Sequence, residues 1–557
     1  MAVGAVGRPR GLGGGMMGTV ILAFDSDAVR AAEEPLLAAG APLMDRAAFA
    51  LAVRVAAELR ARRGRVVGAV VVVLVGAGNN GGDALHAGAL LARRGAGVLA
   101  VATSDRVHAG GLAALCAAGG RVVSVADGGP GPHVWAGDAI AEAYAADVVL
   151  DGLLGIGARG ALRGPAAEVV RLLGELMADE SVGGRGSGPL VVAVDLPSGI
   201  GVDAGDVPRG DDHAGGRAGA DGRSDGPAAV GSVLPADVTV TFGAAKPGLL
   251  LPPAAGLVGR LDVVDIGLDL TGSRPAVARL EPGDIAGLWP VPGASSHKYT
   301  RGVLGVVAGT PAYPGAAVLT VSAAVRAGVG MVRFLGSPGV TATVLAARPE
   351  VVAVDGRVQA WALGPGVDPE DRAQADRVRD GLAQALAREL PAVVDAGGLA
   401  LLPDRLAPWV VLTPHAGELA TLLSARGEDV DRAQVEAEPL RWARRAHELT
   451  RATVLLKGAV TIVVGPEGAV YAQADAPSWL ATAGAGDVLT GLLGALLAGR
   501  AQAVVADPTL VAALASAAAL MHGRAAHRAN PGGPVAALAV ADALPATIAA
   551  VLRGDRD

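Results

Sequence analysis

The sequence predicts an α/β protein with doubly wound parallel sheets, divided into at least two domains. The first observation is length, because 557 residues are too many for a single hydrophobic core. The second is the β-branched run at residues 66–75, which is typical of a strand buried on both faces of a parallel sheet. The third is the alternation of strand-like runs with helical patterns, which favours a doubly wound sheet.

The composition excludes several classes of protein. Hydrophobic residues make up 51% of the chain and aromatic residues 3%, and apolar runs such as residues 69–75 are far shorter than the ~20 residues of a membrane-spanning helix. The net charge is −7 without basic blocks, so we expect no nucleic-acid partner and no membrane partner. Cys116 is the single cysteine, which excludes an internal disulfide and fits the cytoplasm.

Shifts in composition predict the domain boundaries. Residues 1–18 are Gly-rich and are expected to form a disordered leader. Residues 19–270 form the first predicted domain, in which residues 204–232 are rich in Gly, Asp and Arg and predict a disordered insert. Residues 271–293, rich in Pro and Gly, predict a linker to a second domain at residues 294–557.

The first domain is expected to begin with two helices, at residues 28–37 and 46–60. The strand at residues 66–75 follows, and then a helix to Arg94, with further strands at residues 98–102, 121–125, 148–150 and 190–194. Polar residues follow three of these strands: Asn79, Asn80 and Asp83, then Asp151, then Asp195 and Ser198.

Asn80, Asp151 and Ser198 are expected to meet at one edge of the sheet, because the carboxyl ends of parallel strands lie together. Their hard oxygen atoms suit a potassium, magnesium or calcium ion. Each residue singly also fits an ordinary Asx or Ser turn, so the prediction of a cation site depends on all three.

The turn after the first strand also permits another reading. Gly76, Gly78 and Gly81 match the dinucleotide fingerprint, and Asp105 lies roughly where a ribose-binding acid would be, so an NAD-dependent dehydrogenase competes. A plain pyrophosphate turn, however, has no use for the polar side chains between and after these glycines.

Four motifs of the first domain together resemble the NAD(P)H-hydrate epimerase family, the YjeF N-terminal domain. They are Asn79-Asn-Gly-Gly-Asp83, the glycine loop after Asp151, Asp195-Leu-Pro-Ser-Gly199 and Thr241-Phe-Gly-Ala-Ala-Lys-Pro-Gly248. The resemblance covers roughly residues 20–270 and implies potassium ligands at Asn80, Asp151 and Ser198. It also implies contacts with the hydrated nicotinamide nucleotide by Asn79, Asn80, Gly81, Gly82, Asp83, Gly155, Ile156, Gly157, Ala158, Arg159, Gly160, Ala161 and Asp195.

Three residues depart from the family pattern. Ala84 replaces a glycine, Ile200 replaces an aromatic residue, and Arg46 replaces an asparagine in the early segment. Because of these departures, a ligand-binding or scaffold role for the first domain stays open as a non-enzymatic alternative.

The second domain is expected to repeat the strand–turn–helix design. Strands are expected at residues 303–308, before Gly366, before Asp395, from residue 410 and before Lys457, with a hairpin at residues 461–464 and 470–473. The last feature is Gly484-Ala-Gly-Asp487, which leads into an apolar helix. A glycine turn that opens a helix leaves backbone N–H groups free for an anion, and Asp487 could take a proton from a hydroxyl beside a bound phosphate. A simple helix cap is the alternative.

Two further residues of the second domain have functional and structural readings. Lys457 suits a nucleotide phosphate, although a surface lysine can lie at a strand end with no such role. His415 lies between Pro414 and Gly417 at another strand end, where it could contact substrate or only cap the turn.

The Lys-Gly and Gly-Ala-Gly-Asp motifs resemble the ribokinase-like fold. With the motifs around Pro314, Gly366 and His415, the resemblance narrows to the ADP-dependent NAD(P)H-hydrate dehydratase family, over roughly residues 280–553. It implies contacts with the hydrate by Ala316 or Ala317, Gly366, His415 and Asp487. Adenine-nucleotide contacts are implied for Lys457, Gly458, Ala459, Val460, Thr461 and Gly486, and the Gly484, Ala485 and Gly486 N–H groups would steady the phosphate.

The two resemblances together imply a bifunctional repair enzyme. The first domain would interconvert the R and S forms of hydrated NADH or NADPH, with Asp195 as candidate acid and base. The second would dehydrate the S form with ADP and magnesium, with Asp487 as base. We also expect a homo-oligomer. The main rival is a ribokinase-like small-molecule kinase fused to a Rossmann-type ligand-binding domain.

Overall fold

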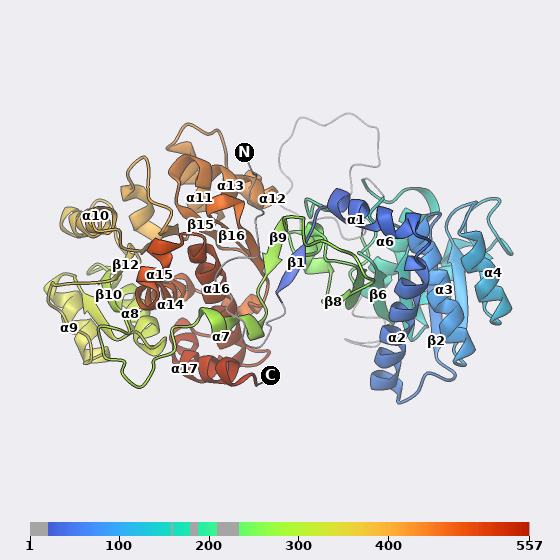
Figure 1. Ribbon diagram of the computed structural model, residues 1–557, viewed down its shortest axis with the longest axis horizontal. Helices are drawn as coiled ribbons and strands as arrows, with labels where there is room; N and C mark the ends of the chain where they lie inside the picture. The colour runs from blue at the N-terminus through green and yellow to red at the C-terminus, as the bar shows by residue number, and fades with distance from the viewer. Residues whose placement is uncertain (1–19, 158–159, 179–187, 209–232, 556–557) are drawn as a thin grey trace. The chain divides into compact units, whose positions relative to one another are not determined.

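The computed structural model describes residues 20–157, 160–178, 188–208 and 233–555 (Figure 1). Two compact units divide the chain: one is Leu22–Pro275, and the other is Ala276–Asp557 with the residues up to Ile21. The predicted leader, Ala158, Arg159 and the predicted insert from residue 209 onward lie outside the described residues.

The first unit contains a parallel sheet of seven strands in the order β4-β3-β2-β5-β6-β7-β8. Its strands are β2 (Val70–Val75), β3 (Gly97–Ala102), β4 (Arg121–Ser124), β5 (Val148–Gly152), β6 (Leu190–Val194), β7 (Val238–Phe242) and β8 (Arg260–Val264). Its helices are α1 (Ser26–Ala38), α2 (Leu43–Arg63), α3 (Asn79–Arg93), α4 (Ala109–Ala117), α5 (Ala136–Tyr144) and α6 (Gly164–Ala178). The strand order reverses between β2 and β5, and such switch points are where open α/β sheets bind ligands.

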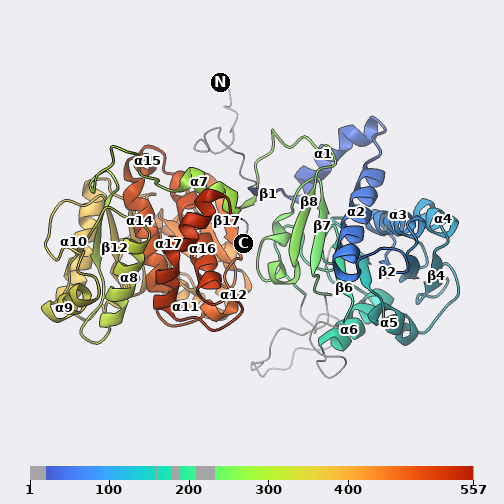
Figure 2. The same ribbon diagram turned by 90° about the horizontal axis from the view of Figure 1, so that it is seen from below.

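Alternate residues of β2 supply two separate cores, because successive side chains of a strand point to opposite faces. Val71, Val73 and Val75 pack with α2, α3 and α4, whereas Val72 and Leu74 pack with α5 and α6. Figure 2 shows α5 and α6 across the sheet from the other three helices. The doubly wound fold predicted from the sequence is confirmed.

Two boundaries in this unit differ from the prediction. The strand begins at Val70 instead of Val66, because Gly68 (φ 77°) turns the chain and the Ala69 N–H donates to the Val66 carbonyl at 3.0 Å. Helix α3 begins at Asn79, with Gly78 as its N-cap, so Asn79–Asp83 form the first helical residues instead of a loop.

The second unit is organised around a sheet of ten strands in the order β1-β9-β17-β16-β15-β14-β13-β12-β10-β11. Its strands are β1 (Ile21–Ala23), β9 (Val277–Arg279), β10 (Val303–Val307), β11 (Met331–Phe334), β12 (Ala360–Leu363), β13 (Ala392–Val394), β14 (Val410–Leu412), β15 (Thr453–Leu456), β16 (Thr461–Val464) and β17 (Val470–Gln473). Strands β10 to β15 pair in parallel, whereas β16 pairs antiparallel with β15 and β17. The predicted hairpin is therefore confirmed at its predicted residues.

Helices cover both faces of this sheet. They are α7 (Ile285–Leu288), α8 (Pro314–Arg326), α9 (Pro338–Ala347), α10 (Arg372–Ala387), α11 (Ala416–Ser424), α12 (Arg432–Ala437), α13 (Pro439–Thr450), α14 (Ala485–Gly499), α15 (Ala501–Ala506), α16 (Leu510–Ala529) and α17 (Ala537–Arg553). Ala362 lies against Gly494 of α14, and its neighbour Leu363 lies against Gly381 of α10, so these two helices cover opposite faces. Helices α8, α14, α16 and α17 pack together on the first face (Figure 2).

The segment predicted as a linker is structured from Ala276 onward. It contains β9 and α7, and Ile285, Leu288 and Trp289 are buried in the core of the second unit. Ala204 to Pro208 of the predicted insert are also described, and the Gly205 N–H donates to the Gly201 carbonyl at 2.9 Å. Both segments thus contain buried side chains or backbone hydrogen bonds, and composition alone does not predict either.

Among the described residues, no single helix is long and apolar enough to cross a membrane. Only α1 and α2 taken together, with a bend of 114° between them, meet the criteria of length and composition.

Candidate active sites

The three predicted cation ligands lie together beside the loop that follows β5. The Asn80 Nδ2 donates to the Leu154 carbonyl at 2.7 Å, and the Ser198 Oγ accepts from the Leu154 N–H at 2.9 Å. Ser198 also donates from Oγ to Asp151 Oδ1 at 2.6 Å and from its N–H to Asp151 Oδ2 at 2.8 Å. The structure therefore brings Asn80, Asp151 and Ser198 to one place.

The chemistry of this group fits a potassium ion. Asp151 is fully buried, and burial raises the pKa of its carboxyl while the hydrogen bonds from Ser198 oppose the rise. In the described chain no cationic side chain pairs with Asp151, and no three His, Cys, Asp or Glu residues are grouped as for a metal ion. One carboxylate with amide, hydroxyl and carbonyl oxygens suits a weakly charged, hard cation better than a divalent one.

Asp195 is held in a strained backbone conformation at the end of β6. Its φ is 68°, and left-handed geometry in a non-glycine residue is common at functional sites. Its Oδ1 accepts from Thr241 Oγ1 at 2.9 Å, the Phe242 N–H at 3.3 Å and Lys246 Nζ at 2.5 Å. Lys246 is 1% exposed, so the two charges form a buried ion pair.

Lys246 received no role in the sequence analysis, although the Thr241–Gly248 motif contains it. The motif letters do not reveal that this lysine turns inward to Asp195, 51 residues earlier. The sequence does contain one signal for this role, because Lys246 precedes Pro247 shortly after β7, a strand of the parallel sheet.

Asp83 lies on α3, close enough to Asp195 for the charge of that carboxylate to act on it. Burial, reinforced by the charges of Asp195 and Glu33 and opposed by Lys246, raises the pKa of Asp83 to about 8. Asp83 is therefore mostly protonated at neutral pH, whereas Asp195 accepts three hydrogen bonds at Oδ1. Glu33, on α1, is a second residue that sequence reasoning missed; burial also raises its pKa.

The glycine loop lies over the cation group. A Cβ on Gly155 would come within 3.1 Å of the Asn80 Cβ, and Arg30 of α1 donates to the Ile156 carbonyl at 2.5 Å. Gly157, Gly160 and Ala161 are described, but no contact places them against Asp83 or Asp195. Gly81 and Gly82 lie in the first turn of α3, where a Cβ on Gly81 would meet the Gly76 carbonyl oxygen at 2.4 Å.

The three departures from the family pattern have local structural explanations. Arg46 donates from Nη1 to the Ile266 carbonyl at 2.7 Å, and Ile200 is buried. Ala84 is buried against Gly152, where a second Cβ would come within 2.5 Å of it. None of the three contacts Asp83, Asp195 or Lys246 through a hydrogen bond in the described structure.

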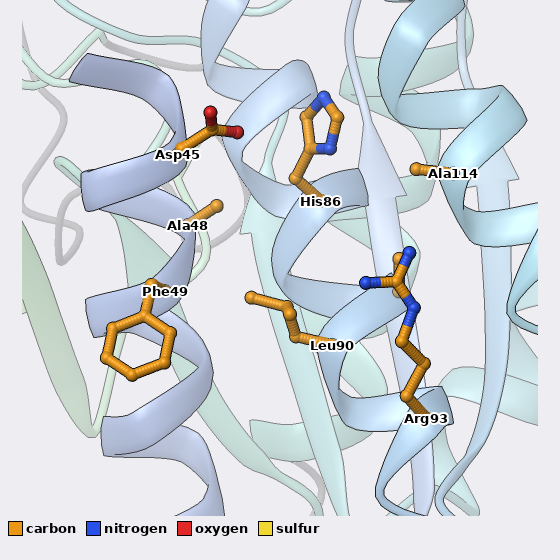
Figure 3. Close-up of a pocket in the computed structure, with 8 residues that line it drawn as sticks. Asp45, Ala48, Phe49, His86, Leu90, Arg93 and Ala114 are labelled. Atoms are coloured by element: carbon orange, nitrogen blue, oxygen red, sulfur yellow. The ribbon is translucent and has the colours of Figure 1, made fainter. Parts of the chain in front are cut away.

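A separate pocket of about 320 Å³ lies among α2, α3 and α4 (Figure 3). It is lined by Asp45, Ala48, Phe49, His86, Ala89, Leu90, Arg93 and Ala114. Burial and the nearby His108 lower the pKa of His86, so its ring is neutral. This pocket contains no residue of the predicted sites.

In the second unit, Asp487 lies in the first turn of α14. Gly484 is the N-cap with φ 86°. A Cβ at this position would lie 2.4 Å from Leu319 Cδ1, so only glycine fits there. The Gly486 N–H that follows belongs to the helix start, which attracts anions, whereas the Ala485 N–H donates to the Thr482 carbonyl at 3.3 Å. Burial and the charge of Asp395, opposed by Lys457, raise the pKa of Asp487 to about 7.

Asp395 connects the strand end of β13 with Lys457 and α14. Its Oδ1 accepts from Lys457 Nζ at 2.8 Å, and its Oδ2 accepts from Thr490 Oγ1 at 2.8 Å. Burial would lower the pKa of Lys457, but Asp395, Glu418 and Asp487 raise it, and the net shift is upward. The sequence analysis identified the strand end but assigned no role to Asp395 or Thr490.

The predicted nucleotide residues occupy the turn between β15 and β16. Lys457 and Gly458 follow β15, Ala459 and Val460 form the turn, and Thr461 begins β16. A Cβ on Gly486 would come within 3.3 Å of Lys457 Nζ, so this turn and the start of α14 face each other. The absence of side chains at Gly458 and Gly486 leaves room for a phosphate beside one ammonium group.

His415 has the capping role that the sequence analysis left open. Its Nδ1 accepts from the Gly417 and Glu418 N–H groups at 3.1 and 3.2 Å, and the His415 N–H donates to the Glu418 carboxylate at 2.8 Å. The imidazole is 57% exposed. It lies beside Lys457 through a bridge between β14 and β15, so capping and substrate contact are compatible.

The remaining predicted substrate residues lie at the start of α8 and in the loop after β12. A Cβ on Gly366 (φ 61°) would come within 2.5 Å of the Ala316 Cβ, which places Gly366 directly against Ala316. Ala317 is buried, and its Cβ lies where a side chain on Gly309 would be. Ala316 is therefore the better candidate of the two alanines for contact with a ligand.

Comparisons with known proteins match both units. A family model described as NAD(P)H-hydrate dehydratase matches residues 304–544, and one described as the YjeF-related protein N-terminus matches residues 40–248. The bifunctional NAD(P)H-hydrate repair enzyme of Mycobacterium tuberculosis is 42% identical over 490 residues, which cover 85% of this chain and 89% of that protein. The Mycobacterium leprae enzyme of the same name is 42% identical over 508 residues, covering 88% and 92%.

A solved structure is also similar to the second unit. The ADP/ATP-dependent NAD(P)H-hydrate dehydratase of Bacillus subtilis, co-crystallised with ATP and Mg²⁺, is 26% identical and covers 49% of this chain and 97% of that chain, with a TM-score of 0.42.

The structure is that of an α/β enzyme of two units, and in each unit a lysine pairs with a carboxylate that follows a strand. The identity with the mycobacterial relatives extends over most of the chain. The chain belongs to the family of bifunctional NAD(P)H-hydrate repair enzymes.

Proposed function

We propose that the first unit epimerises R and S hydrated NADH and NADPH, and that the second unit dehydrates the S form with ADP. Hydration places a hydroxyl on the ring carbon beside the nitrogen and gives both epimers. The observation that carries the proposal is the arrangement of Asp487, Lys457 and the glycine-capped start of α14, which brings a base, a phosphate-binding cation and the Gly486 N–H together.

Asp487 accepts the proton of the substrate hydroxyl as that oxygen attacks the terminal phosphorus of ADP. The N–H groups at the start of α14 and the Lys457 ammonium stabilise the charge on the transferred phosphoryl group. Asp395 and Thr490 hold Lys457 in place. The phosphate then leaves the ring carbon with the C–O electron pair, a ring proton is lost from the next carbon, and AMP, phosphate and the reduced nicotinamide result.

In the first unit, protonated Asp83 donates a proton to the hydroxyl as the C–O bond breaks, and water leaves. The ring nitrogen supplies its lone pair, which gives a cationic ring. The Asp195 carboxylate, which is paired with Lys246, stabilises that cation. Water then adds to the opposite face and returns its proton to Asp83, so that atoms and charges balance.

Two ions complete the proposal. A potassium ion held by Asn80, Asp151 and Ser198 would neutralise the buried Asp151 carboxylate and fix the loop that contains Leu154. Magnesium would accompany the nucleotide phosphates, because phosphoryl transfer needs their charge neutralised. The preference for ADP, the cytoplasmic location and homo-oligomerisation stay predictions.

The test mixes the purified protein with R and S hydrated NADH, ADP, Mg²⁺ and K⁺ and follows the absorbance of the reduced ring. Complete recovery is expected if both sites act. Recovery that stops at the S fraction, apart from slow spontaneous epimerisation, would leave the first unit as a ligand-binding module. No recovery, with phosphorylated alcohol as the product instead of AMP and phosphate, would favour the kinase alternative.

A further inference from the structure

His522 is a buried side chain that the reaction scheme does not use. It lies on α16, is 6% exposed, and its Nε2 is buried without a hydrogen-bond partner in the part of the chain that the structure describes. Burial and the charge of Lys457 lower its pKa to about 4, so the ring is neutral near pH 7. A neutral imidazole can donate from one nitrogen and accept at the other.

The direction of α16 places His522 at the ligand-binding edge of the sheet. Near its start, Ala512 packs against Gly465, close to Thr453 at the beginning of β15. Ser516 hydrogen-bonds the Gln473 side chain at 2.8 Å, at the end of β17. A Cβ on Gly523 would come within 2.8 Å of the Asp475 backbone, beyond that end.

Gln473 pairs with Thr461, so the last part of α16 reaches the same edge as the turn from Lys457 to Thr461. Helix α16 therefore runs from the edge of the sheet where β15 begins to the edge where β15 ends. His522 therefore lies near the nucleotide turn, in agreement with the effect of Lys457 on its ring.

The position of the phosphates determines which part of a nucleotide can reach this residue. Lys457 and the start of α14 place them next to Asp487. His415 and Gly366 follow β14 and β12, and Ala316 lies in the first turn of α8 against Gly366, on the side where the hydrate is expected. The rest of the nucleotide must extend the other way, over β16 and β17, where α16 ends.

We infer that His522 hydrogen-bonds the nucleoside end of the bound adenine nucleotide through its ring nitrogen. This inference rests on the proposed function, since it assumes that the second unit binds ADP. An orphaned buried donor or acceptor destabilises the free protein, and a partner on the ligand removes that cost on binding.

The experiment measures binding of ADP with Mg²⁺ by isothermal titration calorimetry on the full chain, without hydrated substrate. His522→Leu should weaken ADP binding by about tenfold, because one buried hydrogen bond is lost. His522→Gln, which can place an amide nitrogen near the position of Nε2, should recover most of the affinity. Inorganic pyrophosphate with Mg²⁺ should bind wild type and His522→Leu equally, because it has no nucleoside.

His447→Leu is the matched control, because that histidine lies away from the nucleotide turn and already hydrogen-bonds the Ala452 carbonyl at 2.6 Å. It should lower the melting temperature without changing ADP affinity. A merely structural His522 would behave in the same way. Unchanged ADP affinity in His522→Leu, or equal weakening of ADP and pyrophosphate, would overturn the inference. If wild type binds no ADP, the proposed function of the second unit fails instead.

Discussion

Replacement of Asp487 by asparagine tests the centre of the second site. The substitution removes the proton acceptor but keeps the size of the side chain and the glycine turn. A positioned base contributes about 10²–10⁴-fold to rate, so the Asp487→Asn variant should lose at least about 100-fold in dehydration of the S hydrate. ADP affinity should change little, because Lys457 and the helix N–H groups remain.

The pH dependence follows from the raised pKa of about 7. Asp487 must be deprotonated to act as a base, so kcat/KM of the wild type for the S hydrate should rise with pH and level off above about 7. The residual activity of Asp487→Asn should lack this inflection.

Stability should change in the opposite direction from activity. Because the pKa of Asp487 in the folded protein exceeds its ordinary value of 3.8, the carboxyl stabilises the fold below that value and loses this stability as pH rises through about 7. The difference between the folded and unfolded pKa values of Asp487 lowers the free energy of unfolding by about 4 kcal/mol at pH 8 but by only about 2 kcal/mol at pH 5. The Asp487→Asn variant should therefore melt higher than wild type, by roughly 8 °C or more at pH 8 and by less at pH 5.

The two measurements are stopped-flow absorbance of the reduced ring and calorimetric melting at both pH values. Thr490→Val serves as a comparison on the same helix: it leaves the Asp487 carboxyl in place, so its activity should keep the inflection near pH 7 even where loss of the bond to Asp395 slows dehydration. A near-normal dehydration rate in Asp487→Asn would refute the base assignment. A melting temperature below that of the wild type at pH 8 would refute the argument that burial of the charged Asp487 carboxylate destabilises the protein.

Three further predictions concern the other charged groups. Asp195→Asn should spare recovery of the S fraction and stop recovery of the R fraction beyond its spontaneous rate, in the mixed-epimer absorbance assay. The epimerisation rate, measured by chromatography of the two epimers, should fall as pH rises through about 8, because Asp83 must be protonated, and Asp83→Asn should abolish the enzymatic part. Lys457→Met should leave the Asp395 carboxylate uncompensated and cost about 3 kcal/mol in denaturant unfolding, together with loss of ADP binding; unfolding equal to wild type would contradict the pairing.

Much of the fold and of each site follows from local sequence patterns. The β-branched run before Gly76 and the glycine turns after successive strands predict parallel sheets, and the cation group was predicted from three strand ends. These features are local, because the residue type and its place after a strand already determine the edge on which it lies.

The residues that sequence reasoning missed depend on pairing between distant strands. Asp395 meets Lys457 and Thr490 at separations of 62 and 95 residues, and Lys246 meets Asp195 at a separation of 51. No spacing rule relates such positions, because only the order of strands in the sheet brings them together. The predicted length of the linker was too great for a related reason. Pro and Gly are frequent in residues 271–293, but Ile285 and Trp289 are buried in the core of the second unit.

The two ion pairs have a practical consequence for chemical modification. The chain contains only three lysines, and Lys246 and Lys457 hold their amino groups against the buried carboxylates of Asp195 and Asp395. Lys298 is exposed. Among the lysines, Lys298 should therefore be the one that amine-reactive dyes, crosslinkers and solid supports modify, and the two ion-paired ammonium groups should be spared. This protein can then be labelled or immobilised through lysine chemistry without first engineering a tag.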